Sequence, residues 1–457
     1  MSARSRRKTL RVKIQMNSKS ITVVGAGLAG CEAAWQALHR GVSVTLVEMK
    51  PLKYTPAHHS EKFAELVCSN SLRAAALSNA VGLLKEEMRR RSSLIMEAAD
   101  ATRVPAGGAL AVDRELFSEY ITEKLRACPN LDIVNAECGS VDPDAVTVIA
   151  TGPLSSEAMT DFIGTLGCRG LHFFDAAAPI VEFSSVNMDR AFFASRYGKG
   201  DADYINCPMT REEYERFYTE LVSAKEAELH DFDREAQSAG QELTVFEGCM
   251  PVEIMARRGF DTLRYGPLKP VGITDPRTGS EPYAVVQLRK ENNEGTMYNL
   301  VGFQTHLTYP EQRRVFGLIP GLENASFVRY GTMHRNTYLD SPGFLDATYA
   351  VKNRQNLFFA GQMTGVEGYI ESAGSGLVAG TNAARLVLGE EKLIFPRTTV
   401  LGAMAAYVSG GGIGRFTPMN ANFGIVEPLG YRVKGGKTAK NEAIAARALE
   451  ALSALPE

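Results

Sequence analysis

The stretch Ile21-Thr-Val-Val-Gly25-Ala-Gly27-Leu-Ala-Gly30 decides the fold class of this chain. It is a β-branched run that ends in Gly-x-Gly-x-x-Gly, and a helix-like segment follows it at 28–40. A second apolar run, 42–47, then stops at the acid Glu48. Strand, glycine turn, helix, strand and terminal acid in this order predict a βαβ unit that binds a dinucleotide.

Each residue type in this unit has a physical task. Gly25 permits the tight turn, Gly27 lets the backbone approach a pyrophosphate, and Gly30 lets the helix pack close to the strand. The helix N-terminus points its N–H groups and positive dipole end at the phosphates, so the turn residues Ala26, Leu28 and Ala29 join the expected cofactor site. Glu48 is expected to accept hydrogen bonds from a ribose 2′-hydroxyl and to repel a 2′-phosphate.

A second cofactor segment lies far along the chain. The run 145–152 predicts a strand that ends in Ala-Thr-Gly and returns under the dinucleotide. The strand-like run 356–361 ends in Gly361-Gln362 and leads through several glycines, Gly374 among them, into the helical run 377–388. NAD needs only the first fingerprint, whereas FAD-type folds use such a returning segment, so FAD is the predicted cofactor.

These two halves predict an α/β fold, an FAD-binding Rossmann-like domain of glutathione-reductase type with an inserted α+β substrate domain. We expect the FAD domain to comprise 20–152 and 346–457 and the inserted substrate domain to comprise 153–345. Residues 1–19 form a basic extension, either an over-called start before Met16 or a basic arm.

Periodicity places further elements. Helices are predicted at 75–99, at 113–127 with Asp113 as the N-cap, and at 211–229. Strands are predicted at 284–288 and 298–302.

Composition limits the class of protein. Of the 457 residues, 45% are hydrophobic and 22% charged, which is typical of a soluble globular protein, and no apolar run is long enough to span a membrane. The seven cysteines are scattered without a Cys-x-x-Cys pair, and no cluster has metal-ligand spacing. A cytoplasmic protein without a metal, monomeric or weakly homo-oligomeric, is expected.

The net charge of −2 does not by itself suggest a nucleic-acid partner, but its distribution is uneven. Residues 397–440 hold six Lys and Arg against one acid, and six minus one leaves +5 in a glycine-rich tail. Such a segment could follow phosphates or could be an ordinary solvated surface.

Two cysteines merit comparison. Cys68 is the cysteine of the region where disulfide reductases of this fold carry a pair, so a dithiol relay is not expected, and a base, a nucleophile or simple packing stay open. Cys249 lies in Phe246-Glu-Gly-Cys-Met-Pro-Val-Glu253, a loop-like context followed by the basic residues Arg257 and Arg258. Nearby cations raise the thiolate fraction of a cysteine, which favours a nucleophile, although a structural loop is also open.

Several long motifs resemble one family, the folate/FAD-dependent tRNA (uracil-5-)-methyltransferases. The resemblance covers about residues 20 to 450. The motifs are Thr55-Pro-Ala-His-His59, Phe63-Ala-Glu-Leu-Val-Cys-Ser-Asn-Ser-Leu-Arg73, Phe246-Glu-Gly-Cys-Met-Pro-Val-Glu253, Arg264-Tyr-Gly-Pro-Leu-Lys-Pro-Val271, Met333-His-Arg-Asn-Thr337 and Pro418-Met-Asn-Ala-Asn-Phe-Gly424.

The resemblance implies methylation of a T-loop uridine of tRNA to 5-methyluridine. Methylenetetrahydrofolate would supply the carbon, reduced FAD the hydride, and NAD(P)H would reduce the flavin. Cys249 would attack C6 of the uracil, and Cys68 would act as the base or position the flavin. His334, with Asn336 nearby, would contact the folate.

Other readings stay open at this point. They are the larger FAD/folate enzyme that modifies the tRNA wobble uridine, a small-molecule flavin oxidoreductase, and an FAD-stabilised tRNA-binding protein without catalysis. The basic tail, Arg257 and Arg258 are candidate contacts to the tRNA backbone, and base flipping would present the uridine.

Overall fold

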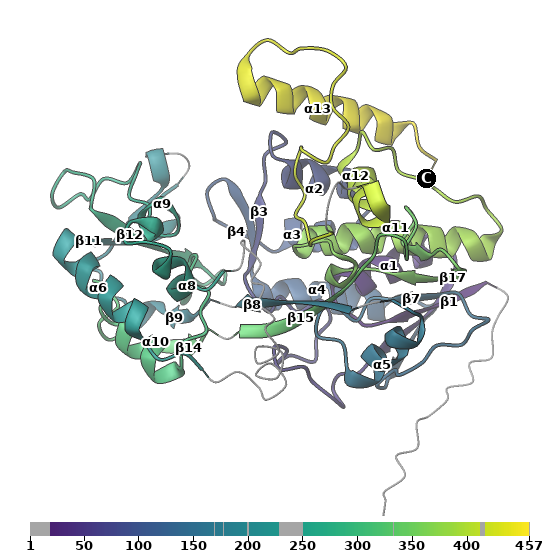
Figure 1. Cartoon of the computed structure of the whole chain (residues 1–457), viewed down its shortest axis with the longest axis horizontal. Helices are drawn as coiled ribbons and strands as arrows, with labels where there is room; N and C mark the ends of the chain where they lie inside the picture. Colours follow the sequence, from purple (N-terminus) through teal and green to yellow (C-terminus); the bar gives the residue numbers. More distant parts are fainter. Residues whose placement is uncertain are drawn as a thin grey trace, which may run out of the picture.

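The computed structural model describes residues 19–168, 170–176, 178–198, 201–227, 250–331, 333–411 and 416–456, and for 170–176, 333–337 and 411 it defines the backbone alone. The basic extension before Lys19 and Cys249 lie outside these ranges. Within them, two lobes with separate hydrophobic cores are joined by a pair of long strands (Figure 1).

A six-stranded sheet with the order β16-β17-β7-β1-β2-β6 forms the centre of the larger lobe. β1 pairs in parallel with β2 and β7, β17 with β7, and β2 with β6, while β16 is antiparallel to β17. The strands are β1 (Ser20–Val24), β2 (Ser43–Glu48), β6 (Leu131–Asn135), β7 (Thr147–Ile149), β16 (Ala350–Val351) and β17 (Arg354–Phe359). Strands from both ends of the chain therefore share one sheet.

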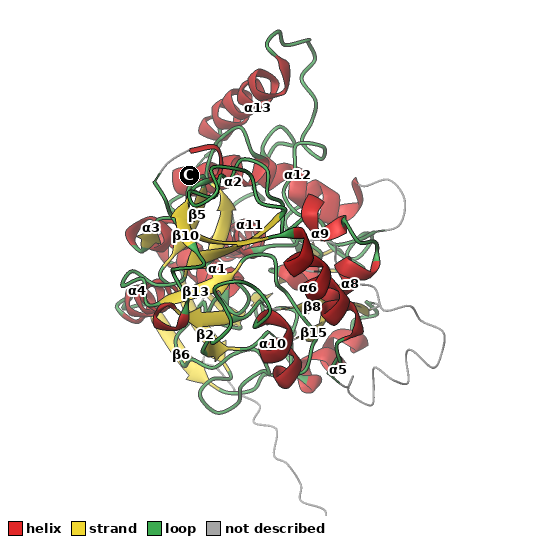
Figure 2. Cartoon of the chain, turned by 90° about the vertical axis from the view of Figure 1, so that its left-hand side faces the viewer, coloured by secondary structure: helices red, strands yellow, loops and turns green. Residues whose placement is uncertain are grey.

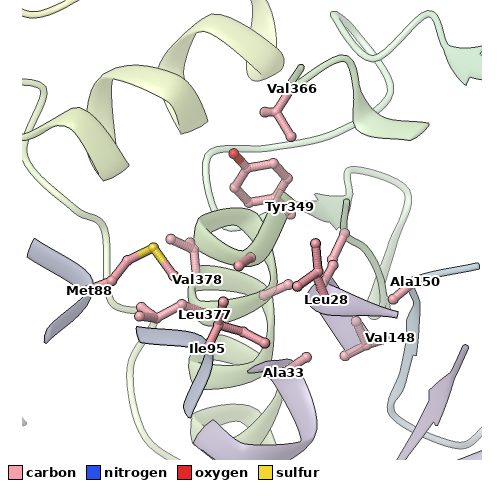
Figure 3. Packing of buried hydrophobic residues seen from close by; sticks show 14 of the residues in the cluster. Leu28, Ala33, Met88, Ile95, Val148, Ala150, Tyr349, Val366, Leu377 and Val378 are labelled. Carbon is pink, nitrogen blue, oxygen red and sulfur yellow. The ribbon is translucent and has the colours of Figure 1, made fainter. Parts of the chain in front are cut away.

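Helices α1 (Leu28–His39) and α11 (Tyr369–Leu388) pack very closely beside this sheet. A Cβ at Gly376 would lie 2.2 Å from the carbonyl oxygen of Ala29, and one at Gly380 would lie 2.4 Å from that of Ala33. Figure 3 shows the apolar side chains around α11, with Leu28 of α1 on one side of the helix and Met88 of α2 on the other, where Leu377 also lies. The two glycines let the two backbones touch, which fixes the second half of the cofactor fold against the first.

Further elements complete the larger lobe. A small sheet with the order β3-β5-β4 lies beside α2 and α3, and α5 lies on the opposite side of the main sheet from α1 (Figure 1). The elements are β3 (Ser71–Ala74), α2 (Ala80–Arg90), α3 (Leu94–Ala101), β4 (Arg103–Val104), β5 (Ala109–Val112), α4 (Arg114–Arg126), α5 (Glu157–Thr165), α12 (Val400–Ala406), α13 (Gly436–Ser453), the 3₁₀ turn η4 (Gln362–Thr364) and the π-helical turn η5 (Tyr407–Gly411).

The smaller lobe is an antiparallel sheet with the order β10-β11-β12-β13-β9-β14. Helices α6, α8 and α10 gather on one side of it (Figure 2) and share its core. The elements are β9 (Ile180–Glu182), η1 (Phe183–Ser185), β10 (Phe192–Ala194), η2 (Arg196–Gly198), β11 (Tyr204–Met209), α6 (Arg211–Ser223), α8 (Val252–Arg257), α9 (Thr262–Tyr265), β12 (Ala284–Lys290), β13 (Met297–Leu300), α10 (Tyr309–Phe316) and β14 (Phe327–Arg329). The antiparallel pair β8 (Gly170–Ala176) and β15 (Met333–Leu339) joins the lobes.

The core of the smaller lobe runs from Val181 to Leu322, whereas Met159 and Ile163 of α5 belong to the core of the larger lobe. The proposed domain boundaries at 153 and 345 stay a prediction. Within the described residues, no helix is long and apolar enough to cross a membrane.

Three expected helices differ from the structure, and two of them lie in the larger lobe. The helix predicted at 75–99 is wrong: it is two helices, α2 and α3, because Ser92 has φ +54° and Ser93 begins α3 by accepting the N–H of Met96 at 3.2 Å. Leu77, within the predicted range, precedes α2 and is 42% exposed. The helix predicted at 377–388 begins at Tyr369, eight residues earlier.

The helix at 113–127 is confirmed as α4, with the Asp113 carboxylate accepting the N–H groups of Glu115 and Leu116, each at 3.1 Å. The helix expected at 211–229 ends at Ser223 in α6.

Candidate active site

The glycine turn between β1 and α1 is shaped by contacts that a side chain would block. Gly25 has φ +99°, and a Cβ there would lie 2.6 Å from the carbonyl oxygen of Ala150. A Cβ at Gly30 would lie 1.8 Å from the carbonyl oxygen of Gly25. These two positions therefore require glycine for the turn itself and for the packing of α1 upon it.

Gly27 and Glu48 have a different environment. Gly27 precedes the first residue of α1, and a Cβ there would meet no heavy atom within 4 Å. The buried Glu48 carboxylate accepts the N–H of Ala26 at 2.7 Å through Oε2 and the N–H of Lys50 at 3.0 Å through Oε1. Glu48, at the end of β2, thus binds the glycine turn at Ala26, while the space that a Cβ of Gly27 would occupy stays open.

A cavity of about 170 Å³ lies against this turn. Of the residues predicted to hold the cofactor, eight line it, namely Gly25, Ala26, Gly27, Leu28, Ala29, Glu48, Gly361 and Gln362. Gly30 and Gly374 are not in its wall. Gly374 packs between helices, because a Cβ there would lie 3.2 Å from Leu401 and 3.4 Å from Leu84.

The cavity wall suits a flavin dinucleotide. It includes the N-terminal residues of both α1 and α11, so backbone N–H groups and two positive dipole ends face it. It also carries the Glu48 carboxylate, and Gly27 leaves room for a close approach of phosphate. The segment around Gly361 and the glycine turn after β1 both line this cavity, as the sequence predicts for the two halves of an FAD site.

Other wall residues were not identified from the sequence. They include Lys50, His58, Glu65, Val67, the segment 153–156, Tyr369 and Ser372, whereas Thr151 and Gly152 end the strand that was expected to return under the dinucleotide. Tyr369 was missed because the helix was expected to begin at 377. The available signal was Gly368, whose φ of +119° ends the preceding loop immediately before α11.

Tyr369 connects the cavity to Cys68. Its hydroxyl accepts the backbone N–H of Cys68 at 2.7 Å and that of Ser69 at 3.1 Å. Burial raises the pKa of this hydroxyl, and the Cys68 thiol raises it further. The Cys68 thiol is half-buried, and Val67 beside it lines the cavity. The structure therefore places one of the two predicted thiols at the edge of the predicted cofactor site.

Arginines from both lobes hold the same loop. Arg329 of β14 donates from Nη2 to the carbonyl oxygens of Val67 at 2.5 Å and Cys68 at 3.3 Å. Arg289 of β12 donates to Ser69 Oγ at 2.6 Å and to Asn70 Oδ1 at 3.1 Å. We call these residues, together with Arg114 of the larger lobe, the arginine clamp.

Arg114 donates to the carbonyl oxygen of Leu66 and forms an ion pair with Glu291. Burial lowers the pKa of Arg289 and of Arg329, and for Arg329 the charge of Arg114 adds to this effect. Three guanidinium groups face a single carboxylate in the clamp, so three minus one leaves two positive charges beside the Cys68 loop. Such a surplus suits a site where negative charge develops.

A second buried polar group lies at the start of α11. Oε1 of the fully buried Glu371 accepts from Arg73 Nη1 at 2.7 Å and from the N–H of Ala421 at 3.0 Å. Burial raises the pKa of Glu371, and burial lowers the pKa of nearby Lys85 to about 7. This group ties β3, α11 and the C-terminal segment together behind the cavity wall.

Cys249 lies outside the described residues, but both flanks of its segment are anchored. The N–H of Ala227 donates to the carbonyl oxygen of His306 at 2.8 Å, and the N–H of Val252 donates to that of Gln304 at 2.7 Å. Glu253 accepts from Thr305 Oγ1 at 2.9 Å and from the N–H of His306 at 2.6 Å. The two ends of the Cys249 segment thus meet at residues 304–306, and its role stays a prediction.

The predicted folate contacts His334 and Asn336 lie on β15, paired with Asp175 and Phe173 of β8. Their side chains are outside the description, so these roles stay predictions. His58 lines the cavity and is 2.6 Å from Thr55 Oγ1. In the described part of the chain, no group of three or more His, Cys, Asp or Glu residues could hold a metal ion.

Comparison of the whole chain with known proteins gives consistent results. A protein-family model described as "Glucose inhibited division protein A" matches residues 20–391. The structures of Aquifex aeolicus GidA in two crystal forms superpose with a TM-score of 0.68 at 17% identity, covering 95% of this chain and 73% or 76% of those chains. This similarity confirms the predicted α/β fold.

Sequence relatives are much closer. The chain is 60% identical over 436 residues to "Methylenetetrahydrofolate--tRNA-(uracil-5-)-methyltransferase TrmFO" of Acetivibrio thermocellus, covering 94% of this chain and 97% of that protein. It is 57% identical over 438 residues to the protein of the same name from Halalkalibacterium halodurans, covering 96% and 98%. The chain therefore belongs to the glucose inhibited division protein A family and, within it, to the methylenetetrahydrofolate–tRNA-(uracil-5-)-methyltransferases.

Proposed function

We propose that this chain methylates C5 of a T-loop uridine in tRNA with a carbon from methylenetetrahydrofolate. Relatives at 57–60% identity that match over nearly their full length are named as tRNA (uracil-5-)-methyltransferases. Those names do not say which uridine is methylated, so the T-loop position is part of the proposal. The structural observation that carries the proposal is the Tyr369 bridge, because one side chain lines the predicted flavin cavity and also holds the Cys68 loop.

The cofactor site is assigned to FAD. The glycine turn from Gly25 to Ala29, Glu48 and Gly361-Gln362 would hold it, since these residues line one cavity. FAD, once reduced by NAD(P)H, supplies the hydride that turns the methylene unit into a methyl group. The protein has to bind the pyrophosphate, exclude water and keep a thiol at the edge of the site.

The two thiols divide the remaining chemistry. C5 of uracil is a weak nucleophile, so the Cys249 thiolate attacks C6, the C5–C6 π electrons move to C5, and C5 bonds to the folate-derived methylene carbon. The C5 proton then has to leave, and we assign its removal to Cys68. The carbon–nitrogen bonds that join this carbon to the folate break, which releases tetrahydrofolate and leaves a methylene group doubly bonded to C5. Addition of a hydride to that methylene, which reduced FAD would supply, gives the methyl group, restores the C5–C6 double bond and expels the Cys249 thiolate from C6.

The arginine clamp explains how a thiol base keeps its place. Cys68 has its N–H held by Tyr369 and its carbonyl oxygen held by Arg329, so the backbone on both sides of the thiol is fixed. The two surplus positive charges of the clamp favour the negative charge that develops on uracil oxygen after attack at C6.

Transfer of labelled carbon tests the proposal. Unmodified tRNA transcript, methylenetetrahydrofolate labelled at the methylene carbon and NADPH are incubated with wild type, Cys249→Ala, Cys68→Ala and the matched control Cys128→Ala, a cysteine that lies beyond the end of α4. Label is expected in T-loop 5-methyluridine with wild type and Cys128→Ala alone.

The other outcomes distinguish the alternatives. Label at the wobble position would assign the chain to wobble-uridine modification. Absence of label from a preparation with bound, reducible FAD would overturn the methyltransferase proposal in favour of a flavin oxidoreductase. Label transferred by Cys249→Ala would reject the assignment of the nucleophile.

A further inference from the structure

Three aromatic rings form a parallel stack on the smaller lobe. The Tyr330 ring is 4.6 Å from that of Tyr309 at an interplanar angle of 15°, and 5.1 Å from that of Phe327 at 12°. Tyr330 therefore lies in the middle, with Tyr309 and Phe327 at the two ends. Among the ring pairs of the described residues the next smallest angle is 29°, at 6.2 Å, between Tyr214 and Tyr218.

The stack is exposed at one end. Tyr309 is 52% exposed, whereas Tyr214 and Phe217 of the adjoining core are fully buried. Core aromatic pairs of this lobe meet at varied angles, from 29° for Tyr214 and Tyr218 to 82° for Phe303 and Phe316. A ladder of three nearly parallel planes with an exposed end ring differs from these pairs because a nucleobase can extend it.

The two segments that carry the stack are locked together. Gln312 of α10 is fully buried, donates from Nε2 to the carbonyl oxygens of Leu307 at 2.7 Å and Gly331 at 2.8 Å, and accepts the Gly331 N–H at 2.8 Å. Tyr309 and Tyr330 are thus fixed before any ligand binds, and a rigid platform loses little conformational entropy on binding.

Charges around the platform favour a polyanion. Arg313, one turn after Tyr309, is exposed and donates to the Tyr330 hydroxyl at 2.5 Å, and Lys225 is exposed beside Thr308. The third cation, Arg314, pairs with Glu311 and Glu220. Arg313 and Lys225 together carry +2, and Arg314 with its two acids carries −1, so the group sums to +1.

The stacked rings lie near the Cys68 loop. Arg329, the clamp residue that holds the Cys68 carbonyl oxygen, stands between Val328 and Tyr330 of the stack segment. Leu307, which Gln312 holds, follows the residues that anchor both flanks of the Cys249 segment. A base bound at Tyr309 would therefore lie next to the arginine that holds the Cys68 loop and next to the residues that anchor the two flanks of the Cys249 segment.

We propose that Tyr309, backed by Tyr330 and Phe327, is a stacking platform for an unpaired nucleobase of the tRNA substrate, with Arg313 and Lys225 taking the adjacent phosphates. The proposal rests on tRNA as the substrate. It adds a recognition surface outside the flavin cavity. Single-stranded bases bind such platforms without sequence preference, so an unpaired base next to the target uridine is the expected occupant.

The test is the dissociation constant for tRNA, measured for wild type, Tyr309→Ala, Tyr309→Phe and the matched control Tyr265→Ala. Tyr265 is 84% exposed and lies on α9 of the same lobe. Tyr309→Ala is expected to weaken binding about tenfold, which is the scale of one lost base stack, and Tyr309→Phe to stay within about twofold, since the ring and not the hydroxyl stacks. Tyr265→Ala should bind as wild type does.

Two further measurements keep the outcomes separate. The slope of log Kd against log salt should be unchanged in Tyr309→Ala, because stacking releases no counterions, whereas Arg313→Ala should reduce it by about one. Wild-type affinity of Tyr309→Ala would overturn the platform, as would a Tyr309-dependent self-association seen by sedimentation. If wild type binds tRNA through Tyr309 but transfers no carbon, the proposed methylation fails and the platform stands.

Discussion

The contact between α1 and α11 and the loop that carries Cys68 are held by opposite means. At the helix contact, glycines bring two backbones together, with a Cβ at Gly376 placed 2.2 Å from the carbonyl oxygen of Ala29. At the Cys68 loop, long polar side chains reach in from other strands and helices, with Arg329 and Tyr369 binding the two sides of one residue. One region depends on the absence of side chains and the other on their presence.

The difference separates two kinds of requirement. The helix contact tolerates almost no added volume, because the atoms in the way are backbone atoms that cannot move aside. The Cys68 loop tolerates a change of side chain in steric terms but loses charged hydrogen bonds. Two of its donors, Arg289 and Arg329, come from more than 200 positions away in the sequence. Damage to the first should unfold the cofactor domain, whereas damage to the second should impair chemistry in a folded protein.

The largest effect is expected from Gly376→Val. The added side chain would have to displace the Ala29 backbone, so we expect the free energy of unfolding to fall by at least about 4 kcal/mol and flavin to be lost from the purified protein. Urea unfolding and the flavin absorbance measure both. Gly164→Ala in α5 is the matched control, because a Cβ there meets nothing within 4 Å, and it should change stability by no more than about 1 kcal/mol. A Gly376→Val protein with wild-type unfolding and flavin would show that the helices can separate.

A buried carboxyl on the helical side of the larger lobe gives the next effect. Glu87 of α2 accepts the N–H groups of Val400 at 2.8 Å and Leu401 at 2.9 Å, and burial raises its pKa from 4.5 to about 7. The folded protein therefore binds this proton more tightly than the unfolded chain does. Stability is lost as pH rises from about 4.5 to about 7, by about 3 kcal/mol for this group.

Glu87→Gln should remove this pH dependence. The free energy of unfolding, measured with urea at pH 5 and pH 8, should fall less with pH in Glu87→Gln than in wild type. Glu32, whose pKa burial also raises to about 7, is present in both proteins and cancels in the comparison. Equal pH dependence in the two proteins would show that Glu87 does not titrate in this window.

The arginine clamp should give a smaller effect on stability and a clear one on catalysis. Arg329→Ala removes the charged hydrogen bonds to the carbonyl oxygens of Val67 and Cys68, so we expect carbon transfer to slow about tenfold to a hundredfold, on the scale of about 1.5–3 kcal/mol, while FAD content stays normal. Arg329→Lys should recover part of the rate, because one ammonium can satisfy part of the pair.

If Arg329 positions the Cys68 loop, the reactivity of the Cys68 thiol should also depend on Arg329. The alkylation rate of Cys68, mapped by peptide mass spectrometry, should change in Arg329→Ala and should not change in the control Arg190→Ala, an arginine that pairs with Glu213 away from the loop. Normal carbon transfer together with an unchanged alkylation rate would contradict the clamp.

The contrast between the α1–α11 contact and the Cys68 loop also explains which features the sequence alone could predict. The glycine turn, the acid that ends β2 and the returning strand were identified correctly because local sterics dictate glycine and β-branched residues at fixed spacing. The early start of α11 was missed, since Gly368 reads as a loop residue until its φ of +119° and the helix that follows are seen together. The break between α2 and α3 was missed because Ser93 sits inside an apolar repeat that continues across it.

The surroundings of Cys68 could not be read in this way. Arg289 and Arg329 look like ordinary strand residues, and nothing in their neighbours indicates that they meet a loop near residue 68. Gly30 packs α1 against the glycine turn, as the motif predicts, and Gly374 packs between helices. Neither lines the cavity, and their place in the cofactor site stays a prediction. Short-range patterns therefore find the cofactor and long-range contacts decide the chemistry.

The smallest effect on tRNA binding is expected from the basic tail, residues 397–440, which the sequence indicated by its charge alone. Arg397, Arg432, Lys434, Lys437 and Lys440 are all exposed in the structure. Replacing Arg432, Lys434 and Lys437 by glutamine should weaken tRNA binding several-fold at moderate salt and reduce the slope of log Kd against log salt by about two to three, without changing the rate at saturating tRNA. Arg190, Arg211 and Arg216, all replaced by glutamine, control for the loss of three positive charges. An unchanged slope in the tail variant would remove the tail from the tRNA interface and leave recognition to the smaller lobe, whose Arg289 and Arg329 bind the Cys68 loop.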